Sequence, residues 1–277
     1  MSVGKFFEGT TLIVSFEGWN DAGESASSAV KFLIDKTAAE PISEIDSQSF
    51  YDYQFARPQV FFDENKARKL RWPTTVFFKP KDAAFSDLIF LVGMEPARNW
   101  LEFSKLVLEI AEDQEVDSVI FVGSMLADAP HTRPIQVTAT STNQDVLELV
   151  DAEKSTYEGP VGILTVLSME FEETGIPTMS LWAAVPHYVH NGPVPKATLA
   201  LVTAIEAHLG FSIDHGNLPD EAFKWERAVD ELAEADEDLA EYVAGLESAR
   251  DESEQTNGDA LAREVEQFLR QAEDEKD

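Results

Sequence analysis

The amino-acid sequence predicts an α/β fold with a mostly parallel sheet covered by helices on both faces, followed by an acidic helical extension. Short apolar runs rich in β-branched residues alternate with stretches in which apolar residues recur at helical spacing. These runs are apolar throughout, as is typical of strands buried on both faces. After residue 217 the pattern changes to a narrow apolar stripe on strongly acidic segments.

The first predicted unit, over residues 11–34, is a strand, a tight turn and a helix. Leu12 to Phe16 suit a buried strand, and apolar residues recur at helical spacing from Ala26 to Ile34. Asp21 is placed to cap this helix, with Glu24 reaching back as in a capping box. In open α/β sheets ligands bind beside such turns, because helix N-termini present unpaired N–H groups there.

The spacing of Gly18 and Gly23 in this turn comes close to the phosphate-binding pattern G-x-x-x-x-G-K-[ST]. That pattern needs a lysine on the phosphates, and this chain has Glu24 there, with Asp21 and Glu17 nearby. Like charges facing each other are unfavourable, so the sequence argues against nucleotide triphosphate binding. It favours a turn whose acidic residues cap the helix.

Residues 41–92 predict three strands and one excursion. The strands are expected over residues 41–46, 74–78 and 88–92. Between the first two, a hairpin or irregular excursion is expected, with turn residues Asp63 to Asn65 at its tip. Its aromatic side chains fit either core packing at a sheet edge or a contact between subunits. They are Phe50, Tyr51, Tyr53, Phe55, Phe61, Phe62 and Trp72.

The alternation of strand and helix continues to residue 210. A helix is predicted over residues 100–112, strands over 116–122 and 135–140, and a short helix over 143–150. Strands over 160–166 and 179–185 and an apolar helix over 195–209 follow. We therefore expect an α/β domain over residues 1–215 and a C-terminal acidic helical hairpin or tail over residues 216–277. The two helices of this hairpin would be separated at Asn257-Gly258.

A second polar turn, PHTRP from Pro130 to Pro134, follows the strand predicted over residues 116–122. Its two prolines stiffen the backbone around His131 and Arg133, which together could bind a carboxylate or a phosphate. The alternative is that both side chains only hydrogen-bond groups of the protein itself.

His187 and His190 follow the strand predicted over residues 179–185. Two histidines three residues apart could ligate zinc, but the chain offers no third ligand nearby and no H-E-x-x-H pattern. We therefore expect no metal and no cofactor. With no cysteine in the chain, thiolate metal sites, disulfides and a cysteine nucleophile are excluded.

The composition excludes several classes of partner. The formal net charge of −31 argues against binding nucleic acid or an anionic membrane surface, both of which need clustered Lys and Arg. No run approaches the roughly 18 apolar residues that a membrane span requires. The segment MSVGKFFEGT has neither the basic region nor the apolar stretch of a secretory signal, so we expect a cytoplasmic protein.

Three local patterns, taken together with their order, resemble the proteasome assembly chaperone 2 family, in particular its actinobacterial branch. They are EGWNDAGE from Glu17 to Glu24, PHTRP from Pro130 to Pro134, and SLWAAVPHYV from Ser180 to Val189. The similarity covers about residues 8–215. It implies a three-layer α/β/α fold like that of phosphorylases and nucleoside hydrolases, and self-association. We expect a homo-oligomer and suspect a trimer.

In the eukaryotic and archaeal relatives, the resemblance implies a chaperone that helps proteasome subunits assemble. The archaeal relatives reach the proteasome through a C-terminal motif of a hydrophobic residue, a tyrosine and any residue. This chain ends in EDEKD, which lacks the apolar residue and the tyrosine. The resemblance therefore predicts proteasome subunits or another protein complex as partners, without that mode of docking.

Two functions are compatible with these observations. The first is a non-enzymatic assembly chaperone or scaffold, favoured because the sequence contains no complete catalytic constellation. The second is a small-molecule binder, or a hydrolase-like or phosphorylase-like enzyme, acting on a nucleoside or carboxylate ligand. All its candidate ligand-binding residues lie just past predicted strands, so one edge of the sheet could gather them. They are Glu17, Trp19, Asn20, Asp21, His131, Arg133 and His187.

Overall fold

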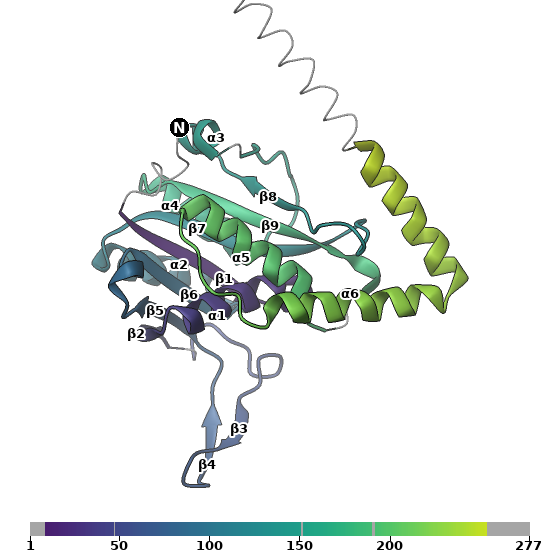
Figure 1. The fold of residues 1–277 in the computed structure, drawn as a ribbon. Coiled ribbons are helices and arrows are strands. Elements are labelled where there is room, and N and C mark those ends of the chain that lie inside the picture. Colours follow the sequence, from purple (N-terminus) through teal and green to yellow (C-terminus); the bar gives the residue numbers. More distant parts are fainter. Residues whose placement is uncertain (1–8, 47, 151, 190–191, 254–277) are drawn as a thin grey trace, which may run out of the picture.

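The computed structural model describes residues 9–46, 48–150, 152–189 and 192–253 (Figure 1). The second helix of the predicted C-terminal hairpin and His190 lie outside these residues. Among the described residues, none of the helices is both long and apolar enough to cross a bilayer.

A seven-stranded sheet forms the centre of the molecule, in the order β2-β5-β6-β1-β7-β9-β8. Its four middle strands are parallel: β6 (Leu88–Met94), β1 (Thr10–Glu17), β7 (Val116–Ala127) and β9 (Thr178–Pro186). These are the apolar runs of the sequence. In β1, every residue from Thr11 to Phe16 is buried, as expected for a strand covered on both faces.

The outer strands make the sheet mixed rather than mostly parallel. They are β2 (Ala39–Ile45), β5 (Thr75–Pro80) and β8 (Val137–Thr140). β2 pairs with β5, β5 with β6, and β8 with β9, all antiparallel. Only a short turn separates β5 from β6, too short for the crossover that a parallel pair needs. The prediction of an α/β fold is confirmed, and the expected excess of parallel pairs is corrected to equal numbers.

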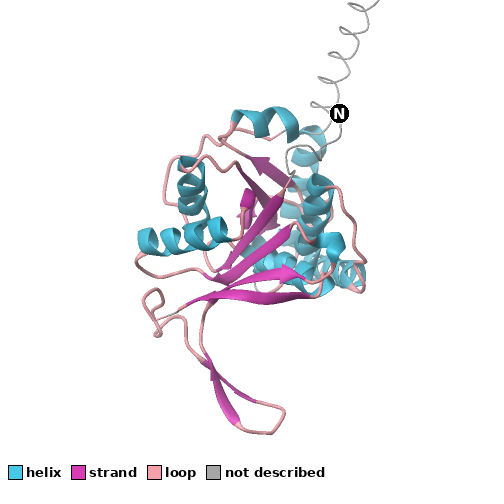
Figure 2. Ribbon diagram, turned by 90° about the vertical axis from the view of Figure 1, so that its left-hand side faces the viewer, coloured by secondary structure: helices cyan, strands magenta, loops and turns pink. Residues whose placement is uncertain are grey.

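Helices cover both faces of the sheet (Figure 2). One face carries α1 (Ser25–Lys36) and α5 (Pro195–Leu209), and α6 (Leu218–Glu234) packs on α5. The other face carries α2 (Trp100–Asp113) and α4 (Ile163–Glu173). Near β8 lies the short helix α3 (Gln144–Val150).

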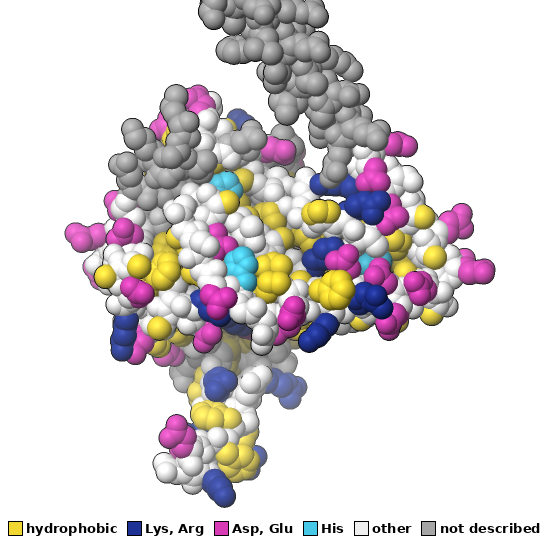
Figure 3. Space-filling view, in the orientation of Figure 1, with side chains coloured by type: hydrophobic (Ala, Val, Ile, Leu, Met, Phe, Trp, Pro, Cys, Tyr) yellow, Lys and Arg dark blue, Asp and Glu magenta, His cyan; other side chains and the backbone are white. Residues whose placement is uncertain are grey.

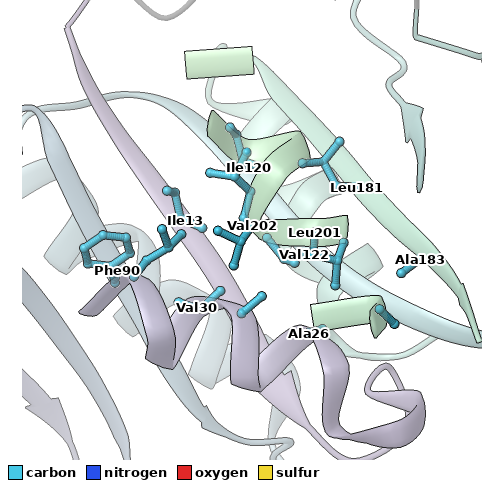
Figure 4. Close-up of a cluster of buried hydrophobic side chains, with 14 of the residues drawn as sticks. Ile13, Ala26, Val30, Phe90, Ile120, Val122, Leu181, Ala183, Leu201 and Val202 are labelled. Atoms are coloured by element: carbon cyan, nitrogen blue, oxygen red, sulfur yellow. The ribbon is translucent and has the colours of Figure 1, made fainter. Parts of the chain in front are cut away.

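Each face has its own hydrophobic core. The core under α1 and α5 includes Ile13, Val30 and Leu201, all fully buried (Figure 4). The core under α2 and α4 includes Phe16 and Phe121. Burying one such side chain contributes about 1.5–3 kcal/mol, so the two cores fix the sheet and thereby its loops.

Residues 160–166, predicted as a strand, instead form the entry to helix α4, which begins at Ile163. Within α4 the buried side chains are Ile163, Leu164, Leu167 and Phe171, a helical spacing that continues beyond the predicted run. A short apolar run does not by itself distinguish a buried strand from a buried helix.

The predicted excursion is a two-stranded hairpin that projects from the body (Figures 1 and 2). It pairs β3 (Gln59–Phe62) with β4 (Arg68–Arg71), antiparallel. Phe50 and Tyr51 at its root are buried in the core, whereas Phe55 and Phe62 are exposed. The aromatic cluster of the sequence is therefore divided between the core and the surface.

Candidate functional site

Four parallel strands end at the same edge of the sheet, and three of them lead into the loops singled out from the sequence. A bridge joins Asp21, in the turn after β1, to Ser124 of β7. The backbone N–H of His131, in the loop after β7, donates over 2.8 Å to the hydroxyl of Tyr188, which follows β9. The three loops therefore meet along one edge.

Asp21 caps helix α1. Its Oδ1 accepts hydrogen bonds from the backbone N–H groups of Ala26, at 2.8 Å, and Ser27, at 3.1 Å. Its Oδ2 is buried and has no hydrogen-bond partner, and burial raises the pKa of the carboxyl. Glu24 has a left-handed backbone and makes no capping bond. The predicted cap is thus confirmed, and the predicted capping box is wrong because a 3₁₀ turn (Ala22–Glu24) separates Asp21 from the helix.

Asn20 is buried and holds neighbouring loops together. Its backbone oxygen accepts from the N–H of Ser124 at 2.8 Å, and its Nδ2 donates to Oε1 of Glu95 at 3.3 Å. The same Glu95 oxygen accepts from the N–H of Ile163 at 2.9 Å, at the start of α4. A Cβ atom on Gly162 would lie 2.1 Å from Asn20 Nδ2, so only glycine fits there. Asn20 therefore links the turn after β1 to β7 and, through Glu95, to the start of α4.

Glu17 and Trp19 lie on the outer side of the same turn. The carboxylate of Glu17 forms an ion pair with Lys31 of α1. The side chain of Trp19 is 73% exposed. Of the four candidates in this turn, Trp19 is the one whose side chain is mainly open to solvent.

His131 is 1% exposed and both of its ring nitrogens are bonded. Nδ1 lies 2.8 Å from the Tyr188 hydroxyl, and Nε2 lies 3.2 Å from Oδ1 of Asp230 on α6. Burial lowers the pKa of His131, which favours the neutral ring. A neutral ring with its proton on Nε2 donates to Asp230 and accepts from Tyr188, which satisfies all three groups. Asp230 thereby ties α6 to the loop.

Arg133 binds the chain's own C-terminal helix, which spans residues 237–253. Its Nε donates to Oδ1 of Asp251 and its Nη2 donates to Oδ2, each over 2.9 Å. Its Nη1 donates over 3.0 Å to Glu247, which also accepts from Thr132. These carboxylates raise the pKa of Arg133, and Arg133 lowers the pKa of Asp251. Arg133 does recognise carboxylates, as its chemistry predicts, and they belong to the protein.

His187 takes part in a cluster of rings with Tyr188 and Tyr242. Its ring centroid is 5.7 Å from that of Tyr188 and 5.6 Å from that of Tyr242, both edge to face. Its Nδ1 lies 3.3 Å from Oδ1 of Asp128, which also accepts from the Tyr242 hydroxyl at 3.1 Å. Burial raises the pKa of Tyr188 to about 12, so its hydroxyl keeps its proton. Tyr242 belongs to the C-terminal helix, which therefore covers this loop as well.

The edge of the sheet is thus covered at His131, whereas the side chains of Arg133 and His187 contact the helix of residues 237–253 and stay 33% and 44% exposed. The covering elements, α6 and the helix of residues 237–253, lie beside the ends of β7 and β9 in Figure 1. No cluster of three or more His, Asp or Glu side chains placed to hold a metal ion occurs within residues 9–253 as far as the structure describes them.

Five residues that complete this arrangement were not predicted from the sequence: Tyr188, Asp230, Tyr242, Glu247 and Asp251. Tyr188 had a local signal, since it adjoins His187 and lies in the same loop. The other four are far along the chain from the loops they contact, in a segment where Asp230, Glu247 and Asp251 are three of many acidic residues. Nothing in their own sequence neighbourhood distinguishes them.

Comparison with solved structures finds proteins of the same fold. A PAC2 family protein from Streptomyces avermitilis is 38% identical, covers 84% of this chain and 99% of its own, and has a TM-score of 0.78. A proteasome-assembly chaperone homologue from Mycobacterium tuberculosis is 37% identical, covers 84% of this chain and all of its own, and has a TM-score of 0.76. Pyrococcus furiosus PbaB, an archaeal proteasome activator, shares the fold at 20% identity, 80% and 93% coverage and a TM-score of 0.63.

Comparison with curated proteins finds no match. The model of the PAC2 family matches residues 15–233, which include all three loops of the candidate site. The match contains more than half of the chain, and it agrees with the resemblance carried by EGWNDAGE, PHTRP and SLWAAVPHYV. This chain belongs to the PAC2 family.

Proposed function

We propose that this protein is a non-enzymatic assembly chaperone or scaffold that acts on proteasome subunits or on another protein complex. Relatives of the same family include a proteasome-assembly chaperone homologue at 37% identity. The observation that carries the proposal is the occupation of the candidate site by the chain's own α6 and C-terminal helix. In this proposal the protein works in the cytoplasm and as a homo-oligomer.

The side chains suited to chemistry are already engaged. An acid–base histidine needs a ring nitrogen free to face a substrate, and His131 has both nitrogens bonded and is buried. An arginine that binds a substrate carboxylate needs its donors free, and the fork of Arg133 is filled by Asp251 and Glu247. These two residues therefore support a structural role more than a catalytic one.

Trp19 provides a group that a protein partner could bind. It is exposed at the same edge, and exposed tryptophans are enriched among the residues that dominate binding energy at interfaces. The turn that carries it is held by the bonds of Asn20 and Asp21, so Trp19 is presented from a fixed backbone. Rigid presentation lowers the entropy cost of binding.

A reconstitution experiment tests the proposal. Purified α and β subunits of the proteasome from the same organism are mixed with and without the protein, and native gels follow the appearance of assembly intermediates and complete particles. We expect the protein to bind a subunit or an intermediate and to speed assembly. The variant Trp19→Ala should bind more weakly, whereas Met169→Ala, which removes an exposed side chain from α4, should bind as the wild type does.

Failure of the protein to bind any subunit or intermediate, or to alter the rate of assembly, would refute the proteasome as its client. Repeating the binding measurement with and without residues 254–277 shows whether that part of the chain takes part. Recovery of no protein complex from cell extract with either chain would overturn the scaffold proposal as a whole.

The second candidate, a binder or hydrolase-like enzyme for a nucleoside or carboxylate ligand, rests on Asp21. Its Oδ2 is buried without a partner, and the raised pKa of the carboxyl is a property shared by acid–base groups of active sites. Thermal shifts measured over nucleosides, nucleotides and carboxylates, on the wild type and on Asp21→Asn, test this candidate. A ligand that stabilises the wild type and not the variant would support it, and no shift for any class would eliminate it.

A further inference from the structure

The hairpin of β3 and β4, here called the arm and defined as residues 55–72, has one apolar face. Val60 pairs with Leu70 and Phe62 with Arg68, and cross-strand partners point to the same side of a hairpin. Trp72 continues that side at the root of the arm, where its ring lies 5.0 Å from that of Tyr53. The apolar arm face therefore consists of Val60, Phe62, Leu70 and Trp72.

This face is open to solvent. Phe62 is 68% exposed and Leu70 is 52% exposed, and Figure 3 shows the hydrophobic side chains of the arm uncovered below the body. A hairpin of two strands is only marginally stable in water by itself, and three or more strands or a packed face are needed for independent stability. A contiguous exposed apolar face on a projecting element is typical of an interaction site.

The charge of the arm is opposite to that of the rest of the chain. It holds five of the 21 basic residues and only two of the 52 acidic residues. The basic ones are Arg57, Lys66, Arg68, Lys69 and Arg71. Arg71 lies over the ring of Phe61 on the opposite side of the hairpin, 5.0 Å from its centroid. The arm thus combines apolar and basic groups, and a complementary surface is apolar and acidic.

A surface of that kind lies at the root of the arm. A cavity of about 790 Å³ is lined by apolar groups that include Trp100 and the exposed Leu101, and it carries the carboxylates of Asp46 and Glu102 beside Lys105. A second cavity, of about 460 Å³, shares Asp46 and adds Glu44, Tyr53 and Trp72. Since Trp72 also ends the apolar arm face, these cavities continue that face. We call them together the root hollow.

The arm meets the root hollow of its own chain only through its root, at Trp72. Strands β3 and β4 project away from the body in Figure 1, and the four residues of β3 span about 13 Å at about 3.3 Å per residue. A second copy of the chain offers the same hollow, and it is acidic overall. If each copy places its arm in the hollow of a neighbour, every arm and every hollow is covered by the same contact. Such a repeated contact is what a closed symmetric assembly requires.

We infer that the arm of one copy docks into the root hollow of a second copy, with Phe62 and Leu70 against Leu101 and Trp100. Arg68, which lies on the same side of the hairpin as Phe62, faces Asp46 and Glu102 of the second copy. This contact goes beyond the proposed chaperone activity and does not depend on the identity of the client.

The mass of the protein in solution, measured by light scattering after size-exclusion chromatography, tests the contact. The wild type should have a multiple of the single-chain mass. The double variant Phe62→Ser/Leu70→Ser should weaken self-association by about tenfold or more, since it truncates the centre of the interface. Met169→Ser removes a comparably exposed side chain from α4 and should leave the mass unchanged. Circular dichroism confirms that each variant is folded.

Reversing the charges on both surfaces tests whether the arm binds a second copy or serves only the fold. Arg68→Glu should reduce the mass, and adding Asp46→Lys/Glu102→Lys to the same chain should restore it, because every copy contributes both an arm and a hollow. An arm that serves only the fold would show no such restoration.

Cross-linking gives an independent measurement, because the chain has no cysteine of its own. A copy with Asn65→Cys at the exposed tip of the arm is mixed with a differently tagged copy with Ser49→Cys in the root hollow and treated with a short bismaleimide. A covalent pair of the two tags is expected, and Met169→Cys in place of Ser49→Cys should give none. A wild type of single-chain mass, arm variants with the mass of the wild type, or the absence of the cross-link would overturn the inference.

Discussion

Arg133 and Asp251 are 118 residues apart in the chain and form a bidentate pair, with Nε–Oδ1 and Nη2–Oδ2 distances of 2.9 Å. Parallel hydrogen bonds between a guanidinium and a carboxylate are directional as well as strong. Here they dock a helix in which Val243 is the one buried apolar side chain among residues 237–253. The position of residues 237–253 therefore depends on a polar contact more than on a hydrophobic one.

Replacing Arg133 should release this helix. In Arg133→Gln, amide exchange over residues 237–253 is expected to become clearly faster, because Asp251 and Glu247 lose their common partner. Exchange in the central strands should stay as slow as in the wild type. Since the pair is partly exposed, added salt should speed exchange of the helix in the wild type and have little effect in the variant. Lys105→Gln, which removes one exposed positive charge from α2, serves as the control. Unchanged exchange in Arg133→Gln would show that the helix is held by other contacts.

Replacing Asp21 by asparagine should destabilise the protein less than replacing it by alanine. Asp21→Ala removes the acceptor of two backbone N–H groups at the start of α1 and should cost about 1–2 kcal/mol in the free energy of unfolding. Asp21→Asn keeps that acceptor and removes the charge that burial disfavours, so it should cost less. Denaturant unfolding measures both values. Asp35→Ala, a charge change in the exposed last turn of α1, should stay within about 0.5 kcal/mol of the wild type. Equal losses for the alanine and the asparagine variants would contradict the capping role.

Stability should fall as the pH drops below 6.5, partly because of His131. Burial lowers the pKa of His131 from its ordinary value of 6.5, so the unfolded chain takes up a proton in a range where the folded chain does not. As the pH falls, this proton uptake by the unfolded state lowers the free energy of unfolding. The stability that the neutral His131 ring provides is therefore complete only above the pH range in which the unfolded chain takes up the proton. His208 is shifted in the same direction by burial.

Thermal unfolding measured from pH 7.5 down to about pH 5.5 tests this dependence. The wild type should lose stability with decreasing pH, and His131→Gln should lose less over the same interval. His208→Gln should remove a further part of the slope, and the double variant should have the flattest profile of the four. A slope in His131→Gln as steep as that of the wild type would mean that His131 does not contribute.

Gly162 should be irreplaceable as long as Asn20 is present. Its backbone has φ of −91°, which alanine can adopt, so the expected penalty is steric: the added Cβ would meet the Asn20 amide. Gly162→Ala should therefore cost about 1–3 kcal/mol in the free energy of unfolding. Gly245→Ala, in the helix of residues 237–253 with nothing within 4 Å of its Cβ, should be neutral or stabilising.

A double-mutant cycle with Asn20→Ala tests whether the two positions are coupled. Removing the Asn20 amide makes room for the Cβ, so the double variant should be less destabilised than the sum of the single variants, by about 1 kcal/mol. If the losses of the two single variants simply add, the Cβ at position 162 does not clash with the Asn20 amide.

The sequence predicted the elements of the body well where the local pattern decides the structure. The buried strands around Ile13, Ile120 and Leu181 are recognisable as short apolar runs. The helix that contains Leu201 is recognisable by its apolar spacing and by the glycine at its end. The entry to α4 was predicted as a strand because Val161 to Val166 is apolar and β-branched, while its helical period shows only through Phe171. Local sequence also does not specify whether an edge strand such as β8 runs parallel or antiparallel.

The sequence predicted where the candidate site lies, but not which contacts its side chains make. Topology alone brings the loops of Asp21, His131 and His187 to one edge, because parallel strands end together. Which partner a side chain chooses there depends on long-range packing. For Arg133 the choice is Glu247 and Asp251, two carboxylates among the 21 that the sequence contains after residue 219.

The match to the PAC2 family ends at residue 233, whereas Glu247, Asp251 and Tyr242 all come later in the chain. In this chain cut after residue 233, the guanidinium of Arg133 would lose both carboxylates and face the surroundings. The helix of residues 237–253 therefore neutralises a cationic surface of the matched region without altering any strand beneath it.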